Sequence, residues 1–529
     1  MTVRMAATLA PGISRAPDPA RMPRQIPFII ANEGCERFSF YGMRNILTPF
    51  LTTTLLLNLP TAARGAAATE VFHTFVMGVY FFPLLGGWLA DRWFGKYHTI
   101  LWFSLIYCVG QGCLAAFPDH RTGFYVGLGL IALGSGGIKP LVSTFMGDQF
   151  DSRTKHLAKL VFDAFYWIIN IGSFTASLTM PWFLGSLGPR IAFGIPGTLM
   201  LISTIVFYSG RRRYIMVPPA PPDPDSFLRV VRTALGAALP GRGRPGLALA
   251  IAGAVLAVGA FGLAFTSLLD PVPAICLGVV LVLAAGGAGT AIQLERARGI
   301  HPDAAVDGVR SVLRVLILFA LITPFWSLFD QKASTWVLQA NVMTKPSWFA
   351  PAQMQALNPA LVLVLIPFNN VVLFPWMRRR GWLPTALRRM TTGIALAGVS
   401  WIVAGLMQLS IDAGTALPIQ WQIVPYIFLT LGEVLVSATG LEFAYSQAPR
   451  SMKGALMSFF WLAATVGSLW VLLANATIKH EAVTHWIAAT TGLSTTAFYM
   501  FFFAGFAFAA ALAFGLYARR YREVDHYRA

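Results

Sequence analysis

Runs of about twenty apolar residues recur along nearly the whole chain after residue 25. An α-helix of that length spans the roughly 30 Å of bilayer hydrocarbon, because each residue adds about 1.5 Å. Charged residues make up 12% of the 529 residues, against roughly 25% in soluble domains, and the mean hydropathy is +0.63. We therefore expect an all-α polytopic membrane protein.

Fourteen apolar runs are long enough to span, in an order of six, two and six. They lie near residues 26–57, 71–93, 98–117, 122–146, 159–185, 189–210, 247–269, 273–293, 310–333, 356–377, 386–410, 421–446, 452–475 and 496–518. A proline-rich stretch cannot be helical and separates the first six from the extra pair. The predicted domains are a disordered tail 1–25, an N-terminal six-helix bundle 26–210, a linker with a lipid-facing transmembrane hairpin 211–309, a C-terminal six-helix bundle 310–520 and a tail 521–529.

The net charge of +18 is distributed unevenly along the chain. Arginine clusters at 211–213, 378–380 and 519–520 fall in alternate loops, the arrangement typical of cytoplasmic loops. The charge therefore indicates topology, and no nucleic-acid partner is expected. No secretory signal opens the chain, so we expect a bacterial inner-membrane protein with both termini cytoplasmic. The four cysteines lie in apolar runs, which predicts neither a disulfide framework nor a zinc site.

The first span carries several ionisable residues, which are expensive inside a membrane and are functional candidates by default. Glu33, Glu36, Arg37, Tyr41 and Arg44 share one helical face, which must point into the bundle. Arg37 can neutralise one carboxylate and leave the other dependent on a distant partner or a proton, so this cluster is a candidate proton carrier. The alternative is a static ion-pair cluster that only fixes helix packing.

Other spans add single charged or titratable residues. His73 and Tyr80 lie on one side of the second span, and a histidine titrates near physiological pH. Lys139 follows a glycine-rich stretch in the fourth span and needs an acid, which Asp330 in the seventh span supplies. Glu433 lies in a later span. Lys332 also falls within a predicted span, without an assigned role.

This distribution places cations in the first half and acids in the second, which suits a zwitterion in a cavity between them. A peptide carboxylate would be drawn to Arg44 and Lys139, and a peptide amine to Glu433, helped by Asn170 and Asn358. In the empty carrier the same groups could pair across the cavity. Binding of substrate or proton would then break a bridge and shift the equilibrium between conformations.

Residues 87–96, with Gly87, Asp91, Arg92 and Gly95, resemble the loop motif G-x-L-A-D-R-x-x-G-K/R of the major facilitator superfamily. The resemblance implies two six-helix bundles around a central cavity. A carboxylate and cations at a helix end can hold neighbouring helices in one conformation.

Residues 33–42 strongly resemble the E-x-x-E-R-F-x-x-Y-G motif of the proton-dependent oligopeptide transporter (POT) family. Further similar stretches are 139–140, 148–150, 165–173, 192–196, 213–214, 358–359, 432–433 and 440–449. The extra hairpin is similar to that of bacterial members. Together these matches span most of the chain.

The resemblance implies a proton-coupled symporter of di- and tripeptides that works as a monomer without a cofactor. It implies proton coupling by Glu33, Glu36 and Arg37, with His73 as a further proton site and Asp330 as the gate acid. It implies peptide contacts with a second group of residues: Tyr41, Arg44, Tyr80, Lys139, Asn170, Asn358 and Glu433. The chain departs from the family at Leu141, where Asn is common, and at Phe40, where some members have Tyr.

Other functions remain as alternatives at this point. A proton-coupled carrier of nitrate, a drug or an amino-acid derivative would use the same scaffold, although Glu433 disfavours it. A membrane hydrolase is disfavoured because neither H-E-x-x-H nor G-x-S-x-G occurs, so we expect no enzyme. A channel is disfavoured because the buried charges are singletons and not rings.

Overall fold

The computed structural model describes residues 22–151, 154–219, 223–237, 243–266, 271–381, 385–447, 452–478 and 480–521. Within these ranges the chain is built of helices, and β-type pairing is limited to two isolated bridges. Residues 1–21 and 522–529, which hold nearly all of the two predicted tails, lie outside the described residues. The all-helical membrane fold predicted from the apolar runs is confirmed.

The first half is a bundle of six crossings. Its helices are α1 (Ile26–Phe50), α2 (Thr61–Phe81), α3 (Pro83–Leu89), α4 (Gly95–Ala116), α5 (Arg121–Gly147) and α6 (Lys155–Ser209), with π-helical turns η1 (Leu51–Leu55) and η2 (Ala90–Phe94) and the 3-10 turn η3 (Gly210–Arg212). Helix α2 begins ten residues before the predicted span, because the alanine-rich residues 61–70 favour helix beyond the apolar run.

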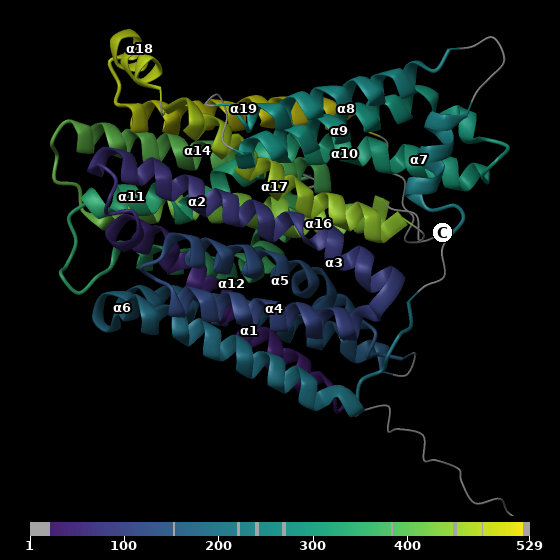
Figure 1. Ribbon diagram of the computed structural model, residues 1–529, viewed down its shortest axis with the longest axis horizontal. Coiled ribbons are helices and arrows are strands. Elements are labelled where there is room, and N and C mark those ends of the chain that lie inside the picture. Colours follow the sequence, from purple (N-terminus) through teal and green to yellow (C-terminus); the bar gives the residue numbers. More distant parts are fainter. Residues whose placement is uncertain are drawn as a thin grey trace, which may run out of the picture.

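The second half repeats the pattern. Its helices are α10 (Asp303–Asp330), α11 (Thr335–Val342), α12 (Leu357–Phe368), α13 (Phe374–Arg379), α14 (Ala386–Asp412), α15 (Ile423–Glu433), α16 (Thr439–Gln447), α17 (Lys453–Ile478), α18 (Glu481–Thr491) and α19 (Thr495–Arg520). Short turns join them: η5 (Gln331–Ala333), η6 (Pro351–Ala356), η7 (Asn369–Leu373), η8 (Ile419–Gln422) and η9 (Val434–Ala438). The short helix α18, which was not predicted, lies at one end of the molecule (Figure 1).

Between the halves lie α7 (Phe227–Gly236), α8 (Pro245–Leu263), α9 (Pro271–Gln293) and the turn η4 (Leu294–Ala297). The predicted hairpin corresponds to α8 and α9, which pack against each other. Outward side chains such as Val255 and Val258 are 65% and 68% exposed, as lipid contact requires. Helix α7 is an addition to the prediction, and its Val230 and Ala234 join the core of the second half.

Eleven helical segments are long and apolar enough to cross a membrane. Two of them, of 54 and 56 residues, are too long for one crossing and fold back at Gly95 (φ 71°) and Gly188 (φ 78°). Only glycine adopts such positive φ values without strain. Counting those segments twice, and adding the charged α1, gives the predicted order of six, two and six within the described residues. We call the two ends the α7 side and the α18 side (Figure 1).

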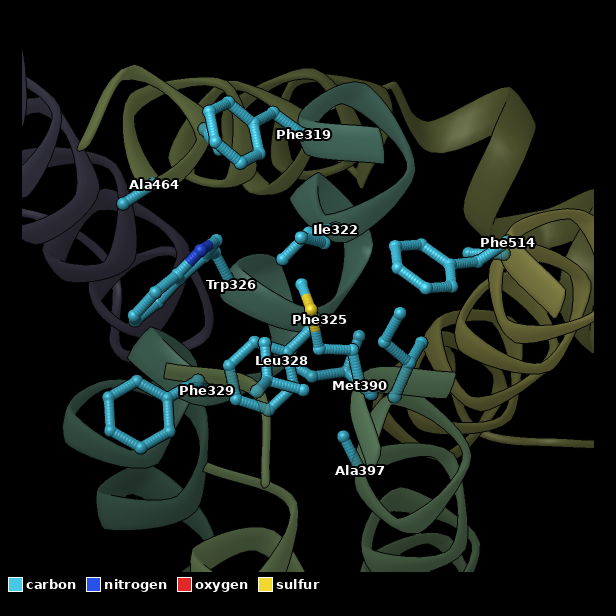
Figure 2. Close-up of a cluster of buried hydrophobic side chains, with 14 of the residues drawn as sticks. Phe319, Ile322, Phe325, Trp326, Leu328, Phe329, Met390, Ala397, Ala464 and Phe514 are labelled. Carbon is cyan, nitrogen blue, oxygen red and sulfur yellow. The ribbon is translucent and has the colours of Figure 1, made fainter. Parts of the chain in front are cut away.

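Each half has its own hydrophobic core. In the second half Phe319, Ile322 and Phe325 of α10 lie at the centre, with Met390 and Phe514 from α14 and α19 closing around them (Figure 2). Lipid is as apolar as these side chains, so close van der Waals packing holds the helices together. Two separate cores leave the plane between the halves as the place where polar groups and movement can be accommodated.

Hydrogen bonds join the halves from the midplane toward the α18 side. The Thr48 hydroxyl donates to the Ala333 carbonyl oxygen over 2.7 Å, and Asn475 Nδ2 donates to the Ala66 carbonyl oxygen over 2.9 Å. Gln353 Nε2 donates to the Leu178 carbonyl oxygen over 2.7 Å. These contacts tie the halves together on the α18 side, so opening that side requires breaking them.

Candidate substrate and proton site

The acidic cluster of α1 is buried within the first half. Glu33 and Glu36 are both 0% exposed. Arg37 Nε donates to Glu33 Oε1 over 2.5 Å and lies 3.1 Å from Glu36 Oε2. Among the described residues, neither Glu36 oxygen has a hydrogen-bond partner. Arg37 therefore binds Glu33 more closely, and Glu36 is the acid whose charge is less well satisfied.

Arg44, two turns further along α1, pairs across the halves. Its Nη2 lies 2.5 Å from Asp330 Oδ1 at the end of α10, and the Asp330 side chain is fully buried. The same segment of the second half is also contacted from α2. His73 Nε2 lies 3.0 Å from the hydroxyl oxygen of Ser334. Residues 330–334 are thus held from two helices of the first half.

Lys139 pairs with neither of the two acids expected for it, since Asp330 pairs with Arg44 and Glu433 accepts a hydrogen bond from Asn358. Lys139 Nζ lies 3.3 Å from the ring centroid of Phe40 and 5.2 Å from that of Tyr80. In the part of the chain that the structure describes, it makes no ion pair. Aromatic faces attract a cation without neutralising it, so Lys139 Nζ has no acidic partner among the described residues, and the carboxylate of a ligand could become one. Phe40, a departure from some family members, is part of this support.

Glu433 lies in a polar chain on the opposite wall. Asn358 Nδ2 donates to Glu433 Oε2 over 2.6 Å and to the Thr430 hydroxyl over 3.2 Å. Lys332 Nζ in turn donates to Asn358 Oδ1 over 2.9 Å. Lys332 was not among the predicted site residues, and its place in an apolar run two positions after Asp330 was the signal for it. The second half therefore contributes a cation as well as acids.

These groups surround a central cavity of about 170 Å³ between the halves. Seven predicted residues line it: Arg37, Tyr41, Arg44, Tyr80, Lys139, Asn358 and Glu433. Residues not predicted also line it: Asn45, Ser173, Ser177, Trp326, Phe329, Lys332, Gln355, Pro359, Ser437 and Trp461. The volume is below the roughly 300–1,000 Å³ of sites for drug-sized ligands, so it suits a small solute.

Asn170 is absent from the cavity lining. Its Nδ2 donates to the carbonyl oxygen of Tyr166, one turn earlier in α6, over 2.9 Å. The amide is thus satisfied by its own helix, and the residue is 7% exposed. Glu33, Glu36, His73 and Asp330 also lie outside the lining, which separates them from the groups that a solute would meet first.

The loop motif of residues 87–96 lies on the α7 side. Gly87 is in α3, Asp91 and Arg92 are exposed in η2, and Gly95 makes the bend into α4. The ion pair that joins helices here is Lys96 Nζ with Asp148 Oδ2, 2.6 Å apart, between the start of α4 and the end of α5. Asp91 and Arg92 of the predicted motif form no ion pair among the described residues, so the role of the motif stays a prediction.

No metal site is formed among the described residues, since no three His, Cys, Asp or Glu side chains gather as ligands.

Comparison with known proteins gives consistent matches. The sequence model of the POT family matches residues 97–491. Solute carrier family 15 member 2 of Mus musculus is 33% identical over 407 residues, covering 74% of this chain and 49% of its own. Peptide transporter family 1 of Drosophila melanogaster is 33% identical over 427 residues, covering 77% and 51%. This chain spans about half the length of these animal relatives.

Two solved structures are more similar in sequence to this chain than the animal relatives are. The crystal structure of an auto-inhibited POT family peptide transporter is 64% identical, with a TM-score of 0.93 over 96% of this chain and 99% of that one. The POT family transporter PepTSo is 64% identical, with a TM-score of 0.92 over 94% and 98%. The family match over most of the sequence, together with the shared fold, shows that this chain belongs to the POT family of membrane transporters.

Proposed function

We propose that this protein is a proton-coupled symporter that imports di- and tripeptides by alternating access. The observation that carries the proposal is the central cavity, which has an unpaired cation, Lys139, on one wall and the carboxylate of Glu433 on the other. A zwitterion of a few residues complements this arrangement. A small anion such as nitrate could bind Lys139 but would bring no cation to Glu433, whereas the amine of a peptide would.

In this proposal the peptide termini bind to opposite walls. The carboxylate binds Lys139, with Arg44 nearby, and the amine binds Glu433 in place of part of its bond with Asn358. Tyr41 and Tyr80 line the sides of the cavity. Because these contacts involve groups that every short peptide has, the site would accept many side chains.

The α1 cluster is proposed to carry the proton. Glu36 is buried, and it meets Arg37 only as an ion pair, without a hydrogen bond from the described residues. Arg37 lies between the two acids and also lines the cavity. A proton on either acid would release Arg37 toward the ligand, which couples the two binding events. His73 and Asp330, on the contact surface between the halves, are proposed to transmit the change.

Alternating access requires the contacts on the α18 side to open. The Arg44–Asp330 pair, the Thr48–Ala333 hydrogen bond and the His73–Ser334 hydrogen bond lie together there. Their loss would open the cavity to that side. The membrane potential supplies about 2.3 kcal/mol per charge per 100 mV, enough to drive accumulation of a neutral peptide with each proton.

Orientation follows from the loop charges. Exposed arginines at 212–213, 378–380 and 519–520 lie on the α7 side, and positive loops face the cytoplasm. We infer that the α7 side is cytoplasmic, that both described ends lie there, and that the membrane is the bacterial plasma membrane. Both halves that line the cavity belong to one chain, so we propose the monomer as the transport unit.

The test is uptake of dialanine and trialanine into proteoliposomes with an imposed inward proton gradient. We expect accumulation above the external concentration, and only equilibration when a protonophore collapses the gradient. Uptake no greater than that of protein-free vesicles would contradict the peptide proposal. Accumulation that persists without the gradient would contradict the proton coupling.

A further inference from the structure

The second half contains another cavity, of about 950 Å³, on the α7 side. It lies among η7, α13, α14, α15 and the end of α19, and α14 and α19 pack side by side (Figure 1). All of its lining residues belong to the second half, so it is separate from the central site. Its volume is at the upper end of the range for ligand sites.

The charge of this cavity has one sign. Arg388, Arg389 and Arg519 line it, and no Asp or Glu is among the described lining residues. The ring of Phe374 lies 5.3 Å from the Arg389 guanidinium carbon. Arg389 Nε is buried without a hydrogen-bond partner in the described residues. A buried donor on a cation is costly unless an anion binds it.

A neutral side chain in the same cavity, Asn369, also lacks hydrogen-bond partners in the described part of the chain. Asn369 lines the cavity from η7 and is 1% exposed. Both its Nδ2 and its Oδ1 lack hydrogen-bond partners among the described residues. Leaving a buried amide group without a hydrogen-bond partner is unfavourable. A ligand with oxygen atoms in the cavity would satisfy the Asn369 donor and the Arg389 donor together.

The region between α3 and α4 is the counterpart, in the first half, of the region between α13 and α14, and the two differ in how their positive charge is neutralised. Both regions contain a glycine with positive φ: Gly95 (φ 71°) directly follows η2, and Gly381 (φ 74°) lies just after α13. In the first half, Lys96 is neutralised by Asp148. In the second half, the described residues around the cavity provide arginines and no acid. Arg389 and Arg519 thus have no acidic neighbour among the described lining residues, and a bound anion would provide the negative charge.

The surroundings identify the source of that charge. The cavity lining includes the apolar residues Leu373 and Met377. Val371 and Trp376, on the same segment, are 74% and 45% exposed, as side chains facing lipid are. The arginines lie where the apolar span ends, at the level of lipid headgroups. Basic pockets between helices at this level are suited to anionic lipid headgroups.

We propose that this cavity binds an anionic phospholipid, with the phosphate at Arg389 and Arg519, glycerol or ester oxygens at Asn369, and acyl chains along Leu373 and Met377. The bound lipid would supply in the second half the negative charge that Asp148 supplies in the first. It would also hold α13, α14 and α19 together on the α7 side.

The test is a lipid titration of the purified full-length protein in neutral detergent, followed by native mass spectrometry. Wild-type protein should retain one phosphatidylglycerol at lower concentration than phosphatidylcholine. Arg389→Gln should weaken phosphatidylglycerol binding about fivefold, and Arg389→Lys should restore most of it. Asn369→Leu should also weaken binding while leaving the charge unchanged, which keeps the test decisive if Arg389→Gln folds poorly.

Arg212→Gln is the matched control, because Arg212 is an exposed arginine of the α7 side that does not line the cavity. Its retention of phosphatidylglycerol should equal that of wild type. Equal retention of both lipids, or equal weakening by Arg212→Gln, would overturn the proposal. Displacement of the lipid by millimolar inorganic phosphate would identify a free-anion site and overturn the lipid assignment.

Discussion

Two groups of buried charge share α1 but differ in what they join. Glu33, Glu36 and Arg37 pair within one helix of one half, whereas Arg44 pairs with Asp330 of the other half. The first group can change its protonation while the halves stay in contact. The second group must separate when the α18 side opens. We propose that their placement on one helix, two turns apart, links the proton to the movement.

The central cavity lies between these two groups. Arg37 and Arg44 both line it, so a bound peptide can compete with the carboxylates for either arginine. We infer that the α1 cluster handles the proton, that the cavity holds the peptide, and that the Arg44–Asp330 pair controls access. Substitutions that affect only one group separate these roles.

The largest effect is expected at the peptide contact. Lys139→Ala should lower the affinity for dialanine by at least about 30-fold, because a buried charge contact is lost. Dialanine amide, which lacks the carboxylate, should bind weakly to wild type and equally weakly to the variant. Competition against a labelled peptide measures both. Lys159→Ala, at an exposed lysine of α6, is the control, and an unchanged dialanine affinity in Lys139→Ala would refute the contact.

The next effect concerns opening of the central cavity to the α18 side. Asp330→Asn removes the ion pair with Arg44 and should shift the conformational equilibrium toward opening of the α18 side by about 5- to 150-fold. Spin labels at Thr53 and Asn341, both exposed on that side, would report a longer distance population. Asp412→Asn, which affects contacts within the second half, should leave the distances unchanged. Identical distributions in wild type and Asp330→Asn would show that the pair does not control access.

A smaller effect is expected at Lys332, which supports Glu433 through Asn358. Lys332→Met removes a charged hydrogen bond and should weaken dialanine binding about tenfold. N-acetyl-dialanine, which lacks the amine, should lose much less. Lys345→Met is the control, since Lys345 bonds to carbonyl oxygens near the end of α11. Equal losses for the two peptides would place Lys332 outside the amine site.

The smallest effect is expected at His73. Its described contact is a hydrogen bond to the Ser334 hydroxyl, which glutamine can retain. His73→Gln should therefore lower gradient-driven uptake only about threefold, while His73→Ala should lower it further. Complete loss of gradient-driven uptake in His73→Gln, with exchange intact, would instead make His73 an essential proton carrier.

The helices and the α1 cluster could be predicted from the sequence because both follow from local rules. Apolar runs of spanning length fix the crossings, and residues three and four apart share a helical face. Glu33 and Arg37 meet for that reason. Helices α7 and α18 were missed because they are 10 and 11 residues long and do not span the membrane.

The pairing between halves could not be predicted, because it depends on which cation the fold brings to which acid. Pairing among Arg44, Lys139, Asp330 and Glu433 was expected without the partners being assigned, and the structure pairs Arg44 with Asp330. Lys332 reaches Asn358 because the 3-10 turn η5 redirects the chain after Asp330. Asn170, expected at the peptide, is satisfied by a carbonyl of its own helix. Each of these outcomes is set by tertiary packing.

The measurement that tests the division of roles most directly compares proton and peptide movement in Glu33→Gln and Glu36→Gln. In proteoliposomes containing a pH-sensitive dye, wild-type protein should acidify the lumen when dialanine is added outside. Each variant should lose this acidification and gradient-driven accumulation, while exchange of labelled for unlabelled dialanine continues at a measurable rate. Equal loss of exchange and acidification would contradict the account and make the α1 cluster a structural ion-pair network.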